Sequence, residues 1–501
     1  MSPNSADESA DGLHLGIDIG TSSSKAVLMN DRGSIAQWCS VPHGVDTPAP
    51  GRYEQDAEAV WWADAVALTR ELLTRPGVTA ARVRSVAVSG IGPCVLPLGE
   101  DGPLRPAILY GIDSRATAEA GELATETGSA RVAFDSQSVL PKLRWLQRHE
   151  PEVWARTRMV LGCGGYLVRR LTGENTLDLY EAGSYFPARR LDGDGWESGL
   201  LAGLGLEGRM PRLLPGAAIA GRVTAAAAAA TGLLAGTPVA APAVDAAAEA
   251  TGAGVGRPGD LMLMYGSTGF LIAVHGQPAP EDVPWRSNFF EAGVYSSAAG
   301  TNAMGTLVDW FRGELGGGSF TALTALAGQS VPGARGVLVL PYWAGERTPV
   351  MDPRARGVIA GLSLRHGRAD VYRGVVEGIA YGIRHAVEAL HVDAGTVRAF
   401  AVGGGANNAL LLQSVSDATG IAQRIPRHVI GAAYGDALRA ATAVGVFPSL
   451  AAAAAAVEQD RVISPRENLR SLHDGRFGLF LELSRGTALV SHELADWEDG
   501  E

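Results

Sequence analysis

A short stretch near the start of the chain carries the residue types needed to hold a phosphate group. In LHLGIDIGTSSSKAVL, residues 13–28, an apolar run contains Asp18 near its end, a turn of glycine and hydroxyl residues follows, and Lys25 opens a second apolar run. The alternating apolar residues on both sides predict two strands joined by a tight turn. Such a turn presents backbone N–H groups, hydroxyls and one ammonium group at a single point, which suits phosphate, and Asp18 could hold Mg²⁺ beside it. An ordinary hairpin with satisfied Ser and Thr side chains is the alternative, and the stretch alone does not decide between the two.

The same plan recurs about 250 residues later. Residues 261–274 read LMLMYGSTGFLIAV, which is again an apolar run, a small turn at residues 266–269 and a second apolar run. Both turns are rich in Gly, Ser and Thr rather than in the Asn-Gly pair of ordinary hairpins. Two such turns, one opening each half, predict a duplicated fold that closes on a polyphosphate.

A carboxylate and a glycine run follow two further predicted strands. Asp245 lies between the apolar run 238–244 and a predicted helix, which places it at the carboxyl edge of a sheet, where open α/β sheets bind ligands. It could equally serve as the N-cap of that helix, and one residue can do both. Residues 403–405 are three glycines between a strand and a helix, which would let a flat ring approach the backbone closely.

The composition sets broad limits. The chain has 501 residues, which predicts two or three domains, and its net charge of −11 argues against nucleic acid as a partner. Lys25 and Lys142 are the two lysines, so a lysine in the first turn is less expected by chance. Three cysteines far apart form no disulfide framework, the N-terminus has no apolar signal region, and no apolar run is long enough to span a bilayer. These features predict a cytoplasmic protein that does not contact a membrane.

The chain resembles the FGGY carbohydrate kinases, the family of xylulokinase, gluconokinase, ribulokinase and glycerol kinase. The resemblance runs in order from about residue 13 to residue 445. It rests on LGIDIGTSSSKAVL at 15–28, TGE at 172–174, VDAAAEATGAG at 244–254, YGSTG at 265–269, GERTPVMDPRARGVIAGL at 345–362, VEGIAYGIRHAVEAL at 376–390 and GGGANNALLLQSVSDATG at 403–420.

The resemblance implies an α/β fold of two actin-like, ribonuclease-H-like domains with a nucleotide and sugar cleft between them. Residues 13–254 would form the N-terminal domain, which binds sugar and phosphate and supplies the catalytic base. Residues 255–445 would form the C-terminal domain, which binds ATP. Residues 1–12 are expected to be disordered, and residues 446–501 to form a C-terminal helical extension and tail.

The resemblance also implies roles for individual residues. Asp245 matches the catalytic base, which takes the proton of the attacking hydroxyl, and Asp18 and Asp245 are the expected carboxylates at Mg²⁺. The residues implied to bind ATP are Thr21, Ser22 and Lys25 in the first turn, Gly266, Ser267 and Thr268 in the second, Gly300 and Met304 where the family's helix lines the nucleotide pocket, and Gly404, Gly405 and Asn408 at the adenosine site.

The sugar side departs from the family pattern. Where xylulokinases have Gln-Met-His-Gly, this chain has GIGPC at 90–94, so that Pro93 replaces a histidine that would meet a sugar hydroxyl. Where they have Trp-Asn-Asp-Gly-Arg, this chain has YGIDSR at 110–115. A structural salt bridge between Asp113 and Arg115 is an equally weighted alternative to a sugar contact. The residues expected to bind substrate are Gly92, Asp113, Arg115 and Asp245.

The sequence therefore predicts an ATP- and Mg²⁺-dependent kinase that transfers the γ-phosphoryl group of ATP to a hydroxyl of a small sugar. A ketopentose such as xylulose or ribulose, a sugar acid or a polyol would fit. The alternative is a catalytically weak sugar-binding regulator that retains the kinase fold. The expected partner is a small-molecule sugar, and a homodimer stays open because homodimers are common in the family.

Overall fold

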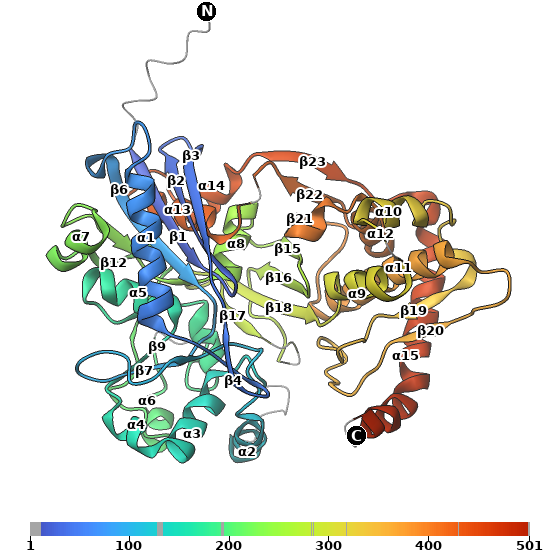
Figure 1. The fold of residues 1–501 in the computed structure, drawn as a ribbon, viewed down its shortest axis with the longest axis horizontal. Coiled ribbons are helices and arrows are strands. Elements are labelled where there is room, and N and C mark those ends of the chain that lie inside the picture. Colours follow the sequence, from blue (N-terminus) through green and yellow to red (C-terminus); the bar gives the residue numbers. More distant parts are fainter. Residues whose placement is uncertain are drawn as a thin grey trace, which may run out of the picture.

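Two seven-stranded sheets form the framework of the protein, one in each half of the chain (Figure 1). The computed structural model describes residues 12–127, 134–191, 195–281, 283, 285–316, 318–428 and 430–498. The disorder predicted for residues 1–12 therefore concerns positions that, apart from Gly12, lie outside the described residues.

The first sheet has the strand order β12-β13-β6-β1-β2-β3, with β14 also pairing with β6. The predicted turn, residues 20–24, joins β1 to β2 as expected, but it is shorter, because β2 already begins at Ser23. The strands are β1 (Leu13–Ile19), β2 (Ser23–Asn30), β3 (Ile35–Pro42), β6 (Val83–Gly90), β12 (Ile219–Arg222), β13 (Pro238–Ala240) and β14 (Ala243–Val244).

The second sheet has the order β17-β18-β16-β15-β21-β22-β23. Its strands are β15 (Asp260–Tyr265), β16 (Gly269–His275), β17 (Arg286–Asn288), β18 (Tyr295–Thr301), β21 (Arg398–Val402), β22 (Gln423–Pro426) and β23 (Gln459–Ile463). The predicted helical extension thus contains, beside helices α14 (Leu450–Ala455) and α15 (Arg470–Glu498), an edge strand of this sheet.

The two sheets repeat one plan. In the first, β3, β2 and β1 run antiparallel, β6 and β13 continue parallel to β1, and β12 closes the edge antiparallel. In the second, β18, β16 and β15 run antiparallel, β21 and β22 continue parallel to β15, and β23 closes the edge antiparallel. The duplicated α/β fold predicted from the two turns is confirmed.

Helices cover both faces of each sheet, and alternation along β1 decides which side chain meets which helix. Leu13, Leu15 and Ile17 point to the face covered by α1 (Ala63–Leu73) and α5 (Cys163–Thr172). The opposite face carries Gly16 and, by the same alternation, Asp18, and it packs against α13 (Ala432–Ala443). The second sheet is covered on one face by α11 (Arg368–Ala389) and α12 (Ala409–Thr419) and on the other by α8 (Asp245–Ala253).

Helices α8 and α13 lie between the sheets and pack directly on each other. A Cβ atom on Gly435 of α13 would stand 1.8 Å from the carbonyl oxygen of Ala248 on α8, and one on Gly16 would stand 2.0 Å from the carbonyl oxygen of Ala433. Helix α13 comes from the second half of the chain but covers the first sheet, so the two halves share one interior.

The remaining elements form smaller layers around this framework. In the first half they are β4 (Asp46–Ala49), β5 (Arg52–Gln55), β7 (Leu96–Leu98), β8 (Ala107–Ile108), β9 (Met159–Leu161), β10 (Thr176–Asp178), β11 (Arg212–Leu214), α2 (Thr117–Thr127), α3 (Val139–His149), α4 (Pro151–Arg156), α6 (Ser198–Gly203) and α7 (Ala225–Thr231). In the second half they are α9 (Gly305–Trp310), α10 (Phe320–Ala327), β19 (Leu338–Leu340) and β20 (Val358–Ala360).

Replacing Gly435 by alanine should destabilise the protein, because the added methyl group would force α8 and α13 apart. We expect the free energy of unfolding to fall by about 2 kcal/mol, the range seen for overpacked interiors. Thermal or chemical denaturation would measure it. Gly121→Ala is the matched control, since Gly121 lies inside helix α2 with nothing within 4 Å of its Cβ position and should gain about 0.5–1 kcal/mol. Equal stability of the two variants would contradict a close contact between the helices.

Candidate active site

The first predicted phosphate turn ends strand β1 and stands open to solvent at Ser22. The backbone N–H of Gly20 donates to the carbonyl of Ser23 at 3.1 Å, and the hydroxyl of Thr21 lies 3.0 Å from that of Tyr110. Lys25 lies directly opposite Asp18 in the β1–β2 pair, so the two side chains share the sheet face toward α13. The Lys25 ammonium nitrogen lies 3.6 Å from the Cβ position of Gly431, which immediately precedes α13.

Asp245 is the first residue of helix α8 and follows the short strand β14. Strand β14 pairs parallel with the last residues of β6, so Asp245 does lie at the carboxyl edge of the first sheet, as the sequence predicts. Its Oδ1 accepts a hydrogen bond from the N–H of Ala246 at 2.7 Å. The carboxylate therefore lies beside the free N–H groups at the start of a helix, where a negative charge is favoured.

Four carboxylates come together around this point from three elements. Asp18 lies on β1, Asp245 and Glu249 lie on α8, and Asp436 lies on α13. Burial, followed by repulsion from Asp18, raises the pKa of Asp245 well above its usual value. Burial likewise raises the pKa of Asp18 to about 6 and that of Glu249 to about 7.

Ser89 joins two of these carboxylates. Its hydroxyl lies 2.5 Å from Oδ2 of Asp436 and 3.3 Å from Oδ1 of Asp18. One hydroxyl hydrogen cannot be donated to both, so a proton on one carboxyl group would complete the pair of bonds. Burial raises the pKa of Asp436 to about 7, which suits Asp436 for carrying that proton.

Arg439 supplies the positive charge that faces this group from inside the protein. It is fully buried, its Nη1 donates to Oδ1 of Asp436 at 2.6 Å, and its Nη2 donates to the carbonyls of Ala241 and Pro242 at 2.5 and 2.8 Å. Those carbonyls lie in the segment that leads to Asp245. Arg439 therefore ties α13 to the approach to the predicted catalytic residue.

The carboxylate oxygens of Asp18 and Asp245 are suitable ligands for Mg²⁺. Repulsion from Asp18 adds to burial in raising the pKa of Asp245, and a divalent cation would relieve that repulsion. Within the described ranges, no three His, Cys, Asp or Glu side chains converge as a complete metal site. Magnesium bound with phosphate needs only one or two protein carboxylates, so these residues are sufficient.

The second predicted phosphate turn lies between β15 and β16, with Ser267 and Thr268 exposed. The carbonyl of Gly266 accepts the N–H of Gly305, and that of Ser267 accepts the N–H groups of Met304 and Thr306, each at 3.1 Å. The start of helix α9 therefore packs directly on this turn. A Cβ atom on Gly305 would stand 2.6 Å from the Gly266 carbonyl oxygen, which explains a glycine there.

Five further residues are predicted nucleotide contacts. Gly300 lies in strand β18 rather than in a helix, and Met304 precedes α9 with its side chain buried in the core. Gly403 and Gly405 pack against Tyr265, whereas Gly404 is exposed with nothing within 4 Å of its Cβ position. The Oδ1 atom of Asn408 accepts the N–H of Leu411 at 3.1 Å and caps α12. An open approach to the backbone exists at Gly404.

The predicted sugar contacts are largely engaged with the protein itself. The Asp113 carboxylate is buried, accepts Nη2 of Arg115 at 2.7 Å and the N–H of Tyr53 at 2.7 Å, and Arg115 also pairs with Glu54 at 2.8 Å. This geometry favours the structural salt bridge that the sequence left open. Gly92 lies against Val244, the residue before Asp245, where a Cβ atom would stand 2.9 Å from a Val244 methyl group.

Sequence reasoning missed several charged residues of the site. Asp436 and Arg439 stand three residues apart in an alanine-rich helix, and two charges in such a helix are the signal that could have found them. Arg347 follows the buried Glu346, donates to the carbonyl of Thr301 at 3.2 Å and is attracted by the carboxylates of Glu346 and of Asp135, the latter in the first half. Both Glu346 and Arg347 belong to the GERTP motif, for which the sequence analysis proposes no role.

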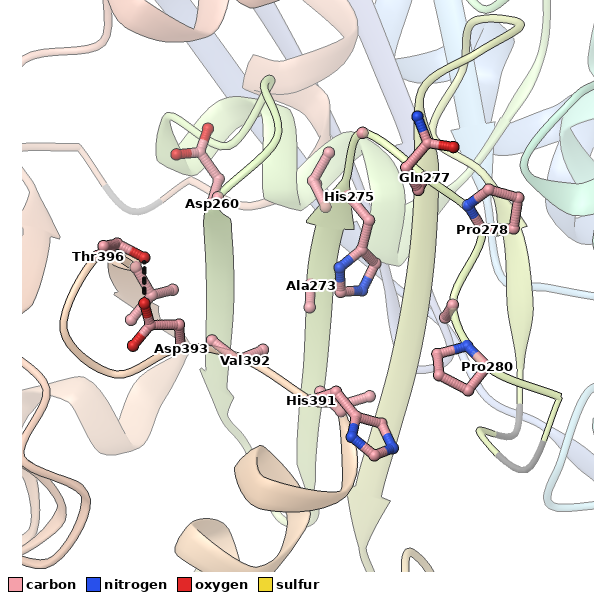
Figure 2. A pocket seen from close by; sticks show the side chains of 16 residues that line it. Asp260, Ala273, His275, Gln277, Pro278, Pro280, His391, Val392, Asp393 and Thr396 are labelled. Atoms are coloured by element: carbon pink, nitrogen blue, oxygen red, sulfur yellow. Dashed lines mark hydrogen bonds between the residues drawn. The ribbon is translucent and has the colours of Figure 1, made fainter.

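A cavity of about 500 Å³ lies at the other end of the second sheet (Figure 2). Asp260 begins strand β15 there, whereas the phosphate turn follows the end of the same strand. The cavity is lined by residues 259–260, 273–280, 390–393 and 396–397, and none of the predicted site residues is among them.

Among the helices that the structure describes, none has the length and apolar character needed to cross a membrane.

Glu346 should make stability depend on pH. Burial raises its pKa to about 7, although it accepts bonds from the Thr301 hydroxyl at 2.9 Å and from the Arg347 N–H at 2.7 Å. Between about pH 4.5 and 7 the unfolded chain releases a proton that the folded protein keeps, so stability falls as pH rises through this window. Relative to Glu346→Gln, the wild type should lose up to roughly 3 kcal/mol of unfolding free energy across it.

Denaturation of both proteins at several pH values would measure this difference. Glu100→Gln is the control, since Glu100 is exposed and its replacement should leave the pH profile unchanged. A constant difference between wild type and Glu346→Gln from pH 4.5 to 7.5 would show that Glu346 is ionised throughout the window.

Comparisons with known proteins identify the family. The family models of the N-terminal and C-terminal domains of the FGGY family of carbohydrate kinases match residues 13–252 and 261–444. The xylulose kinase of Escherichia coli strain K12 is 31% identical, with 81% of this chain and 85% of that protein covered. The gluconokinase of Bacillus subtilis strain 168 is 25% identical, with 97% and 98% covered.

Solved structures agree with the sequence matches. The xylulose kinase of Rhodospirillum rubrum superposes with a TM-score of 0.85 at 29% identity, covering 96% of this chain and all of that one. The gluconate kinase of Lactobacillus acidophilus superposes with a TM-score of 0.88 at 20% identity, covering 97% and 100%, and shows the fold. The predicted two-domain actin-like fold is therefore confirmed. The chain belongs to the FGGY family of carbohydrate kinases, which are phosphotransferases with an alcohol group as acceptor.

Proposed function

We propose that this kinase transfers the γ-phosphoryl group of ATP to a hydroxyl of a small sugar, a ketopentose such as xylulose or ribulose, a sugar acid or a polyol. The relatives named above are xylulose kinases and a gluconokinase, which favours the first two classes. The observation that carries the proposal is Asp245, a carboxylate of raised pKa at the edge of the first sheet.

Asp245 would act as the general base. It would accept the proton of the sugar hydroxyl as that oxygen attacks the γ-phosphorus and the bond to the bridging oxygen of ADP breaks. A base works best when its pKa lies near the operating pH, and burial, with repulsion from Asp18 added to it, raises the pKa of Asp245 in that direction. The buried position of Asp245 would thus have a catalytic use.

The phosphates of ATP would lie between the two turns. Thr21, Ser22 and Lys25 would contact them from the first half, and Gly266, Ser267 and Thr268 from the second, with backbone N–H groups and hydroxyls as donors. The adenosine would lie along Gly404 and Gly405 near Asn408, with Gly300 and Met304 behind the second turn. Asp18 and Asp245 would hold Mg²⁺, which neutralises phosphate charge when it is bound.

Arg347 strengthens the proposal from the second half. Its guanidinium stands beside Gly300, where a Cβ atom would lie 3.2 Å away, and within electrostatic range of Tyr110, whose hydroxyl contacts Thr21. A positive charge at this point, between the two turns, would favour the negative charge of a phosphoryl group in transfer. The regulator alternative gains no support, because both turns and both predicted carboxylates are present together.

Asp245→Asn should abolish turnover while ATP still binds. We expect kcat to fall about 10²–10⁴-fold, the contribution usual for a general base, with the KM for ATP changed far less. ADP release with ATP, Mg²⁺ and a panel of ketoses, sugar acids and polyols would measure it. Asp101→Asn, at an exposed loop carboxylate, is the control. Full activity in Asp245→Asn would overturn the assignment of the base.

Asp113→Asn tests whether Asp113 contacts the sugar. Because its carboxylate is saturated by Arg115 and Tyr53, we expect the variant to lose about 3 kcal/mol of unfolding free energy, as a broken buried ion pair does. The KM for the sugar should change little in the remaining folded protein. A KM raised tenfold or more at unchanged stability would instead make Asp113 a sugar contact.

A further inference from the structure

We propose that Asp436 of helix α13 is a positioning residue, which acts through Ser89 to hold the Asp18 carboxylate where it would bind Mg²⁺. The inference rests on the proposed role of Asp18 and goes beyond it, because it gives a helix from the second half of the chain control over a metal ligand in the first half. It is carried by the register of the first sheet, by the seat of Asp436 on that sheet, and by the contacts that fix the Asp436 carboxylate.

Asp18 has a cross-strand neighbour on each side in the first sheet. Lys25 of β2 is its antiparallel partner, and Ser89 of β6 is its parallel partner. Partners in neighbouring strands project from the same face of a sheet, so these three side chains form a row under helix α13, which packs on all three strands (Figure 1). The Asp18 carboxylate is therefore attracted by an ammonium group on one side and can accept a hydrogen bond from a hydroxyl on the other.

Asp436 is seated directly on this face of the sheet. A Cβ atom on Gly16, two residues before Asp18 on β1, would stand 2.9 Å from the Cβ atom of Asp436. Side chains two residues apart in a strand share a face, so Asp436 can lie beside the row only because residue 16 has no side chain. Asp436 and Ser89 are both completely buried. Oδ2 of Asp436 lies 2.5 Å from Oγ of Ser89, which lies 3.3 Å from Oδ1 of Asp18.

Arg439 keeps the Asp436 carboxylate from turning away from Ser89. The other carboxylate oxygen, Oδ1, accepts Nη1 of Arg439 at 2.6 Å, and the central guanidinium carbon lies 5.0 Å from the centre of the Phe290 ring. Nη2 of Arg439 donates to the carbonyl of Gly216 at 3.0 Å, in addition to the two carbonyls before Asp245. One oxygen of Asp436 is thus held by an anchored charge, which leaves the other directed at Ser89.

An ion pair that only attaches α13 to the first half is the alternative. Charges inside a buried helix cost desolvation, and apolar residues of similar size often replace such a pair without loss of stability. A pair with that single task would need no contact with the row of Asp18. The bond from Asp436 to Ser89 instead leads from the pair to a proposed metal ligand, and loss of such an outer partner usually lowers metal affinity or activity by about 10–100-fold.

Ser89→Ala tests the link, because it leaves both Asp436 and Asp18 in place. We expect the Mg²⁺ concentration at half-maximal ADP release to rise about tenfold or more, while the KM for the sugar changes by less than about twofold. Mn²⁺ prefers the same oxygen ligands and gives a second readout that needs no turnover, since electron paramagnetic resonance measures its free concentration. The dissociation constant of Mn²⁺ should rise by a similar factor.

Ser85→Ala is the matched control. Ser85 lies on the same strand and face as Ser89, is equally buried, and also bonds to α13, because its hydroxyl donates to the carbonyl of Ala440 at 2.8 Å. Its hydroxyl further contacts Nδ1 of His14 at 2.7 Å, where Ser89 contacts carboxylates. The two variants should therefore unfold at similar denaturant concentrations, whereas the Mg²⁺ and Mn²⁺ constants should change only in Ser89→Ala.

A further variant removes the positioning residue and its anchor together. Asp436→Ala combined with Arg439→Met replaces the buried pair by apolar side chains, so that neither charge is left without its partner. If Asp436 acts through Ser89, this variant and Ser89→Ala should raise the metal constants by the same factor, and the triple variant should raise them no further. Two independent structural effects would instead multiply in the triple variant.

Unchanged metal constants in Ser89→Ala would overturn the proposal, and so would equal changes in Ser89→Ala and Ser85→Ala, or multiplied effects in the triple variant. A wild-type protein that binds no Mn²⁺ would overturn it as well. Absence of turnover with every acceptor would count against the proposed function alone, because the Mn²⁺ titrations would still decide the role of Asp436.

Discussion

The contact between helices α8 and α13 is the constraint on which the rest of the structure depends. Their backbones touch at Gly435 and Ala248, and α13 is pressed equally closely on Gly16 of strand β1. Each helix covers a sheet of the other half of the chain, so neither sheet has a complete core without it. Side chains larger than hydrogen at these glycines would separate the halves and with them the carboxylates of the site.

The chemistry of the site follows from this packing. Asp245 and Glu249 lie on α8, Asp436 lies on α13, and Asp18 lies on the strand beneath, so the helix contact itself brings four carboxyl groups together in a buried place. Such a group costs stability unless it is neutralised. The guanidinium of Arg439 offsets part of this cost by pairing with Asp436. Protons on the carboxyl groups whose pKa is raised offset more of it.

Much of the fold could be predicted from the sequence because it is encoded locally. The two turns, their flanking strands and the position of Asp245 between strand and helix depend on neighbouring residues, and the structure has them as expected. The position of α13 could not be predicted, because nothing in its alanine-rich sequence indicates that it packs on a sheet whose strands lie about 400 residues earlier in the chain. For the same reason Ser89, Asp436 and Arg439 were not recognised as parts of the site.

The proposed phosphate side and sugar side of the site are built differently, and this difference decides which of them can select the substrate. The proposed phosphate side consists of two tight turns, whose backbone N–H groups would suit any polyphosphate. The proposed sugar side is assembled from distant loops. Its polar pair, Asp113 and Arg115, already forms hydrogen bonds within the protein. Substrate choice would therefore rest on other groups, and Arg347 of the GERTP motif, which is attracted by the carboxylate of Asp135 in the first half, is a candidate.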